Sequence, residues 1–147
     1  MSAQPYLSIL QYNVMKSRDK VMASLVRDKR ITGFDVLAIQ EPWRNPFTHT
    51  THNPIPQHFE LAYLEHGKTR VCFFINKRIP SHHWTVTHHT PDVSTLGLQW
   101  GEQGETIAIH NIYNPVVAIE PTYSAITALQ GVLRQWNRTE QLIDTQP

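Results

Sequence analysis

Hydrophobic and polar residues alternate along several short stretches of the chain, a pattern typical of β-strands. The stretch YLSILQYNV predicts a first strand over residues 6–13. The compact apolar run FDVLAIQ, residues 34–40, is typical of a strand buried on both faces. Between them, from Asp19 to about residue 30, apolar residues recur at helical spacing: Val21, Met22, Leu25 and Val26. The order strand, helix, strand predicts a parallel crossover.

The remainder of the chain predicts mainly antiparallel strands. FELAYLE and RVCFFINK, separated by HGKT, predict a hairpin, and WTVTHHT, STLGLQW and TIAIHNIY predict three more strands. A helix is expected to begin at Pro121, with one apolar face made of Ile126, Leu129, Leu133 and Trp136. EQLIDT then begins a further strand. The predicted class is α/β (α+β), a mixed, mostly antiparallel sheet with flanking helices.

Residues 42–58 follow neither period and contain four prolines, so they predict an irregular loop. A loop of this length inside a compact domain usually has a function. It begins directly after Glu41, an acidic residue at the end of an apolar strand. The loop and the carboxylate of Glu41 that precedes it are therefore candidates for a functional site.

Length and composition limit the class of protein. The 147 residues are enough for a single domain, residues 1–147, and the hydrophobic content of 40% is ordinary for a globular protein. No apolar run approaches the roughly 20 residues of a membrane helix, and no targeting signal is visible at the start. The only cysteine, Cys72, fits a reducing compartment. We therefore expect an intracellular protein without a membrane span.

The net charge is +1, so a surface that binds phosphate has to be local rather than a property of the whole chain. Basic residues do cluster after the first predicted strand and after Glu41, namely Lys16, Arg18, Lys20 and Arg44. A solvated loop explains either cluster alone equally well.

Polar side chains follow three of the predicted strands. The first ends in Asn13, the second in Glu41, and HNIYNP places Asn111 and Tyr113 on one face of a third. Ligands of open α/β sheets bind beyond the carboxyl ends of strands. A carboxylate, two amides and a phenol suit a hard cation and a phosphate, because magnesium takes one or two carboxylates and completes its shell with water and phosphate.

The motifs LQYNV, DVLAIQEPW and HNIYNP, in this order, resemble the first half of the endonuclease/exonuclease/phosphatase superfamily. This superfamily includes apurinic endonucleases, deoxyribonuclease I, sphingomyelinases and inositol polyphosphate phosphatases. QYNVMKSRDKVMASLVRD, AIQEPWRNPF and VCFFINKR most resemble the endonuclease domains that fungal non-LTR retrotransposons carry ahead of their reverse transcriptase. The resemblance implies the amino-terminal half of a four-layer α/β sandwich, a single truncated domain.

The resemblance also implies roles for four residues. Glu41 corresponds to the metal ligand, with Mg²⁺ (or Mn²⁺) as the cofactor. Asn13 corresponds to the asparagine that helps hold the metal-site carboxylate and the phosphate. Tyr113 corresponds to the tyrosine that hydrogen-bonds the scissile phosphate, with Asn111 as a weaker candidate beside it. The implied partners are DNA and, in the intact parent, a reverse transcriptase domain, which implies a nuclear location.

The chain departs from this superfamily in two motifs. A Gly-Asp-x-Asn motif normally orients the attacking water, and a final Ser-Asp-His supplies a histidine. The 147 residues contain no Gly-Asp pair and no Asp-His pair. We therefore expect a fragment of a magnesium-dependent DNA endonuclease that is inactive as given.

Other interpretations remain open at this stage. The substrate could be a small phosphate ester or a lipid, or the chain could be a catalytically dead module that binds nucleic acid or a partner. Adjacent histidines invite a zinc site at His82, His83, His88 and His89, but neighbouring residues on a strand point to opposite faces. Glu41 could also be a surface carboxylate, Asn13 a turn residue and Tyr113 a strand aromatic. Trp43, beside Glu41, is the aromatic best placed to stack on a base.

Overall fold

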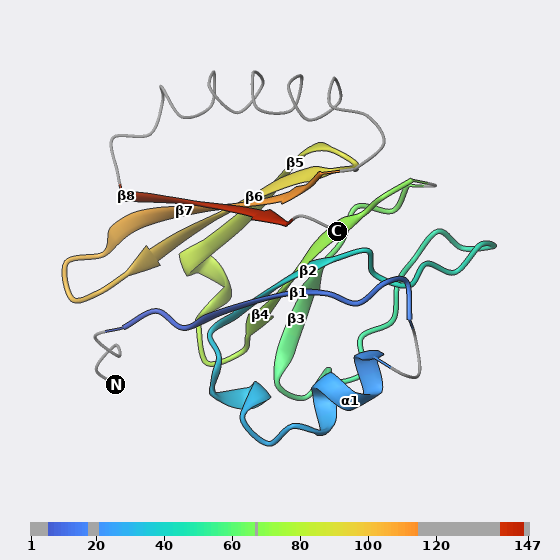
Figure 1. Cartoon of the computed structure of the whole chain (residues 1–147). Coiled ribbons are helices and arrows are strands. Elements are labelled where there is room, and N and C mark those ends of the chain that lie inside the picture. The colour runs from blue at the N-terminus through green and yellow to red at the C-terminus, as the bar shows by residue number, and fades with distance from the viewer. Residues whose placement is uncertain (1–5, 18–20, 67, 115–138, 146–147) are drawn as a thin grey trace.

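A computed structural model describes residues 6–17, 21–66, 68–114 and 139–145, and it contains two four-stranded sheets packed face to face (Figure 1). The first sheet has the order β1 (Ile9–Asn13), β2 (Val36–Gln40), β4 (Val71–Asn76), β3 (Phe59–Ala62). The second has the order β5 (Trp84–Thr90), β6 (Val93–Trp100), β7 (Glu105–Tyr113), β8 (Thr139–Thr145). Both sheets are mixed, since β1–β2 and β7–β8 pair in parallel and the other pairs are antiparallel.

The predicted strands are confirmed, and the parallel pair β1–β2 is joined through helix α1 (Val21–Arg27) and a 3₁₀ turn (Ile31–Gly33). β1 begins at Ile9 rather than at residue 6. Just before it, the Ser8 amide donates to the Asp35 carboxylate at 2.8 Å, while the Ser8 carbonyl accepts from the Asp35 and Val36 amides. A second 3₁₀ turn (Ser81–His83) leads into β5. EQLIDT is confirmed as part of β8, whereas the helix expected from Pro121 lies outside the described residues.

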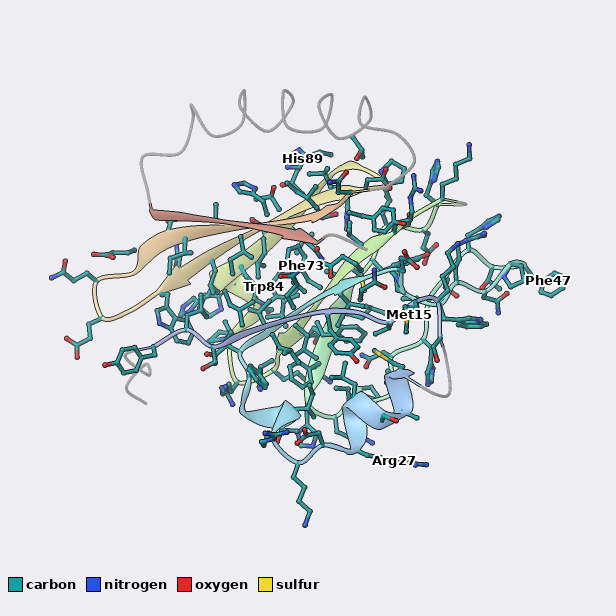
Figure 2. All side chains as sticks on the ribbon, viewed as in Figure 1. Met15, Arg27, Phe47, Phe73, Trp84 and His89 are labelled. Carbon is teal, nitrogen blue, oxygen red and sulfur yellow. The ribbon has the colours of Figure 1, made fainter. Side chains whose placement is uncertain are left out.

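The main core lies between the two sheets. Phe73 of β4 is fully buried there, and Figure 2 shows it between the ribbons of the two sheets. The other buried members of this cluster are Val36, Ala38, Ile75, Ile79, Leu96, Leu98 and Ile109. Fully burying one such aliphatic or aromatic side chain contributes about 1.5–3 kcal/mol, so this interface stabilises the packing of the two sheets.

A second core lies on the opposite face of the first sheet. Leu37, Ile39, Cys72 and Phe74 alternate with the residues of the main core and pack toward Met22 of α1. The central strands are therefore buried on both faces, as the continuous apolar run at residues 34–40 predicted. Burial raises the pKa of the Cys72 thiol far above its usual range, so this side chain remains a protonated, apolar core residue. None of the described helices is long and apolar enough to cross a membrane.

The sheet register brings several strand ends to one edge. Asn13 pairs with Gln40 across β1–β2, and Gln40 pairs with Val71 across β2–β4. Because β4 is antiparallel to β2, the residues that precede β4 meet those that follow β2. The polar residues after β1 and β2 and the loop before β4 therefore share one edge of the sandwich.

Candidate functional site

Glu41 leaves β2 in a left-handed backbone conformation with φ 51°. Its amide donates to the Arg70 carbonyl at 2.8 Å, and its own carbonyl accepts from the Lys16 amide at 2.7 Å. A non-glycine residue in this region costs of order 1–3 kcal/mol and persists only where neighbouring contacts impose it. The two backbone bonds hold Glu41 in place, and the buried Pro42 ends the strand directly after it.

Asn13 shapes the turn beside Glu41. Its Oδ1 accepts from the Met15 amide at 2.8 Å, and the Val14 amide donates to the Gln40 carbonyl at 3.0 Å. Met15 and Lys16 also have positive φ, 52° and 59°. Asn13 thus stabilises the turn that carries Lys16 toward Glu41, which is the kind of local bonding that asparagine favours.

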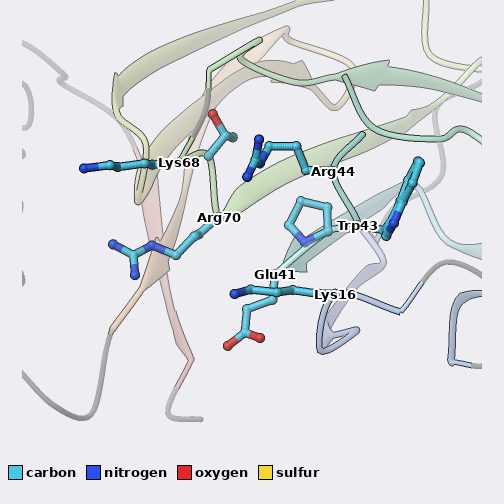
Figure 3. A pocket seen from close by; sticks show the side chains of 8 residues that line it. Lys16, Glu41, Trp43, Arg44, Lys68 and Arg70 are labelled. Atoms are coloured by element: carbon cyan, nitrogen blue, oxygen red, sulfur yellow. The ribbon is translucent and has the colours of Figure 1, made fainter. Parts of the chain in front are cut away.

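An open cavity of about 570 Å³ lies at this edge of the sandwich, and Figure 3 shows the side chains around it. Its lining consists of Lys16, Glu41, Pro42, Trp43, Arg44, Lys68, Thr69 and Arg70. Four cationic side chains therefore surround one carboxylate. Such an excess of positive charge in a concave surface attracts anions, and arginine and lysine are the usual ligands of phosphate.

Arg70 connects the cavity to the second sheet. Its guanidinium forms a two-pronged ion pair with Asp92, at 2.6 and 3.0 Å, and lies 4.9 Å from the centre of the Tyr113 ring. The Tyr113 amide donates to the Asp92 carbonyl at 2.8 Å. The ion pair therefore fixes the end of β7 against the loop that precedes β4.

The phenol of Tyr113 lies close enough to Glu41 for the two to interact. Burial, followed by the hydrogen bond and negative charge of Glu41, holds the pKa of Tyr113 above its usual value, while Arg70 acts in the opposite direction. Tyr113 is therefore a protonated hydrogen-bond donor at neutral pH. The structure brings Glu41 and Tyr113 together and places Asn13 at the adjoining turn.

Asn111 lies in the interior beneath the cavity. It is fully buried between the sheets, where its Nδ2 donates to the carbonyls of Ile39 at 3.2 Å and Cys72 at 2.9 Å. Its Oδ1 accepts from Nε2 of Gln40, the residue before Glu41. Asn111 shares a strand face with Tyr113, as predicted, but it contacts the backbone of the first sheet. Neither residue lines the cavity; Tyr113 borders it through Glu41 and Arg70.

The donor set fits a metal only in company with phosphate. Within residues 6–17, 21–66, 68–114 and 139–145, no three histidine, cysteine or acidic side chains converge. In the part of the chain that the structure describes, Glu41 is the one carboxylate that lines the cavity. Magnesium is commonly held by one or two carboxylates plus water and substrate phosphate, and the surrounding cations suit that phosphate.

Since no three potential metal ligands converge among the described residues, the histidines there form no zinc site. His88 bonds to Ser94 and His89 to Thr95, both at 2.8 Å, and these two side chains lie on opposite faces of the second sheet. His82 and His83 contact each other edge to face, at 4.4 Å between ring centres.

Two cationic residues of the cavity, Lys68 and Arg70, were not identified from sequence. The signal for them is the antiparallel pairing of β2 with β4, which sets the residue before β4 beside the residue after β2. Lys16 and Arg44 belong to the local basic clusters visible in the sequence. Arg18 and Lys20, from the same clusters, lie outside the described residues.

No profile of a known protein family and no curated protein sequence matches the chain. Among solved structures, the chain is similar to the endonuclease domain of TRAS1, a telomere-specific non-LTR retrotransposon, with a TM-score of 0.61 and 15% identity over 95% of this chain. The chain has the endonuclease/exonuclease/phosphatase fold. The AP endonuclease LMAP from Leishmania major is similar with a TM-score of 0.54 and 14% identity over 88% of this chain. The human Nocturnin catalytic domain with bound sulfate is similar with a TM-score of 0.61 and 12% identity over 98% of this chain.

The chain spans 57%, 47% and 66% of the lengths of these three structures. At such low identity the likeness concerns the fold. The mixed sheets and the flanking helix agree with the predicted α+β sandwich.

Proposed function

We propose that the cavity binds a DNA phosphodiester together with Mg²⁺ (or Mn²⁺), and that the chain carries the metal- and phosphate-binding part of a retrotransposon-type DNA endonuclease. The observation that supports this most strongly is the single carboxylate of Glu41, held in a strained conformation among four cationic side chains. Strained residues of this kind concentrate at functional sites. The fold, shared with nucleases, supports the same assignment.

Each side chain then has a separate task. Glu41 would hold the metal, which when bound neutralises negative charge that develops on the phosphate. Lys16, Arg44 and Lys68 bind phosphate oxygens, and Tyr113 donates a hydrogen bond to one of them. Arg70 keeps Tyr113 in place through Asp92 and the ring contact.

The openness of the cavity favours a polymer over a small ester or a lipid. Its cations come from three separate segments, the turns after β1 and β2 and the loop before β4. The adjoining apolar pocket, which shares Pro42 and Trp43 with the cavity, has a volume of only about 10 Å³, too small for an acyl chain. A backbone with successive phosphates would contact all three segments. The retrotransposon assignment carries with it the expectation of a reverse transcriptase partner and a nuclear location.

Removing the Glu41 charge is expected to abolish metal binding. Titration of Mn²⁺ into the wild-type chain should give weak binding, about millimolar, that tightens when a short DNA is present, because phosphate completes the shell. Glu41→Gln should lose the metal signal in calorimetry or in NMR relaxation. Glu102→Gln, an equal charge change in the exposed β6–β7 turn, is the matched control. Equal Mn²⁺ binding by wild type and Glu41→Gln would remove Glu41 from the site.

A second candidate function is binding without turnover. The 147 residues contain no Gly-Asp or Asp-His pair, and no histidine of the described residues lines the cavity. We expect salt-dependent DNA binding by this chain and no nicking of supercoiled plasmid with Mg²⁺, measured over hours on agarose gels. A plot of the logarithm of the binding constant against the logarithm of the salt concentration should have a slope of about −0.9 for each duplex phosphate that the protein neutralises. Metal-dependent nicking that survives Glu41→Ala would contradict the assignment of the site.

A further inference from the structure

Phe47 is the most exposed large hydrophobic side chain among the described residues, at 90% exposure. Figure 2 shows it projecting from the tip of the loop that follows β2. Single exposed apolar residues are common on protein surfaces and need no explanation by themselves. Two further observations suggest a function for Phe47: the loop that carries it is held rigid, and the base of that loop lines the cationic cavity.

The loop of residues 44–51, here named the Phe47 loop, is held by its own hydrogen bonds. Oδ1 of Asn45 accepts from the amides of Phe47 at 2.8 Å and Thr48 at 3.3 Å. The Asn45 amide donates to the Thr50 carbonyl at 2.7 Å, and the His49 amide donates to the Asn45 carbonyl at 2.9 Å. An Asx turn closed in this way fixes the backbone. The loop therefore holds Phe47 out in solvent.

The base of the Phe47 loop is part of the cationic cavity. Arg44 lines the cavity and pairs with Thr51 across the loop as an isolated bridge. The Arg44 guanidinium contacts Nδ1 of His49 at 3.2 Å, and the Thr51 hydroxyl donates to the Trp43 carbonyl. A fixed aromatic therefore stands at the tip of a loop whose base lines a cavity with four cationic side chains and one acidic side chain.

We propose that Phe47 stacks on an unpaired base of a nucleic-acid strand whose backbone phosphate lies in the cavity. The inference rests on the proposed function and adds a substrate class: DNA with an unstacked base beside the bound phosphate, as in a single strand or a junction. Every base has a π-face, and proteins that bind single strands combine a positive groove with stacking aromatics. The phenyl ring of Phe47 has no polar atom, so the contact is indifferent to base identity.

The charge around Phe47 selects nucleic acid over a protein partner. The cavity beside the loop favours a ligand with regularly spaced negative charges and flat apolar groups, and a DNA strand offers both. A second copy of the chain, with a net charge of only +1, offers no matching acidic charge excess. Self-association through Phe47 is the competing outcome in the test.

The test compares the wild-type chain with Phe47→Ala, Phe47→Trp and Tyr6→Ala. Tyr6 is 79% exposed and lies before the amino end of β1, whereas the cavity lies beyond its carboxyl end. It therefore serves as the matched exposed aromatic. The probes are a labelled single-stranded oligonucleotide containing 2-aminopurine and the corresponding duplex, followed by anisotropy and by 2-aminopurine fluorescence. Phe47→Ala should weaken single-strand binding on the order of tenfold, abolish the fluorescence quenching and leave the salt slope unchanged. Phe47→Trp should restore both signals, and Tyr6→Ala should match wild type.

Separate outcomes identify which statement fails. Lys68→Ala should reduce the salt slope by about one; if it does and Phe47→Ala still binds and quenches like wild type, the stacking inference is overturned and the phosphate cavity stands. If neither the wild-type chain nor any variant shows salt-dependent DNA binding, the proposed function and the stacking inference are both overturned. If Phe47→Ala changes only the sedimentation of the chain, removing concentration-dependent dimers without affecting DNA affinity, Phe47 is a self-association contact and the inference is overturned.

Discussion

Replacing Asn111 by leucine is expected to lower the free energy of unfolding by about 3–5 kcal/mol, because each buried polar group left without a partner costs about 1–3 kcal/mol. Asn111 is fully buried and supplies partners to the Gln40 side chain and to the carbonyls of Ile39 and Cys72. Leucine has the same number and branching of side-chain heavy atoms but can satisfy none of these groups. Urea unfolding followed by circular dichroism gives the free energy directly.

The double variant Gln40→Leu with Asn111→Leu separates this effect from simple loss of packing. Removing both side-chain partners leaves fewer buried polar groups without a hydrogen bond. The loss of unfolding free energy in the double variant should therefore be smaller than the sum of the losses in the two single variants. Gln103→Leu, in the exposed β6–β7 turn, is a control that should leave the unfolding midpoint nearly unchanged. An Asn111→Leu protein within about 0.5 kcal/mol of wild type, the usual range for surface changes, would show that the bonds between the sheets are not needed.

Replacing Asp35 by alanine is the second change with a large expected effect. The Asp35 carboxylate has no exposed surface, pairs with Arg78 at 2.7 Å and accepts from the Ser8 amide at 2.8 Å. Breaking a buried ion pair from one side costs about 3–5 kcal/mol, since a buried charge loses its partner. The Arg78 side chain keeps 29% exposure and also donates to the carbonyls of Thr32 and Gly33, so the lower end of that range is expected.

The pair formed by Asp28 and Arg30 offers a matched comparison. It has the same 2.7 Å separation as the Asp35–Arg78 pair, but its side chains are 38% and 86% exposed. Solvent screens such a pair, so Asp28→Ala should leave the melting temperature nearly unchanged. Differential scanning calorimetry of the two variants at neutral pH checks the contrast. Equal melting temperatures for Asp28→Ala and Asp35→Ala would mean that burial of the ion pair does not determine its contribution.

The strands and the position of Glu41 could be predicted from sequence because they depend on local signals. Period-two alternation marks each strand, and Pro42 ends the apolar run directly after the carboxylate. The division into two packed sheets could not be predicted in this way, because alternation reveals the faces of a strand but not the partner of each face. The predicted start of β1 lies three residues before Ile9, because alternation does not reveal that the Ser8 amide bonds to the Asp35 side chain while only the Ser8 carbonyl bonds to backbone.

In the candidate site, too, local sequence motifs identify some residues, whereas others depend on contacts between distant parts of the chain. The short motifs indicated Glu41, Tyr113 and Asn13, and the structure brings these residues to one edge. Alternation placed Asn111 on the face of Tyr113, but whether that face meets solvent or another sheet depends on residues 71 positions away in the chain, such as Gln40. Lys68 and Arg70 reach the cavity only through the pairing of β2 with β4, which no local pattern encodes.

In the proposed site, Glu41 holds a divalent cation that is shared with a phosphate in this cavity. The most direct measurement is a crystal structure of the chain grown with Mn²⁺ and a short DNA strand, with data collected at the manganese absorption edge. We expect one anomalous peak about 2.1 Å from a carboxylate oxygen of Glu41, a distance typical of such small hard cations, with a phosphate oxygen completing the shell beside Lys68 and Tyr113. A manganese peak bound elsewhere, with DNA phosphate in the cavity and no metal at Glu41, would contradict it.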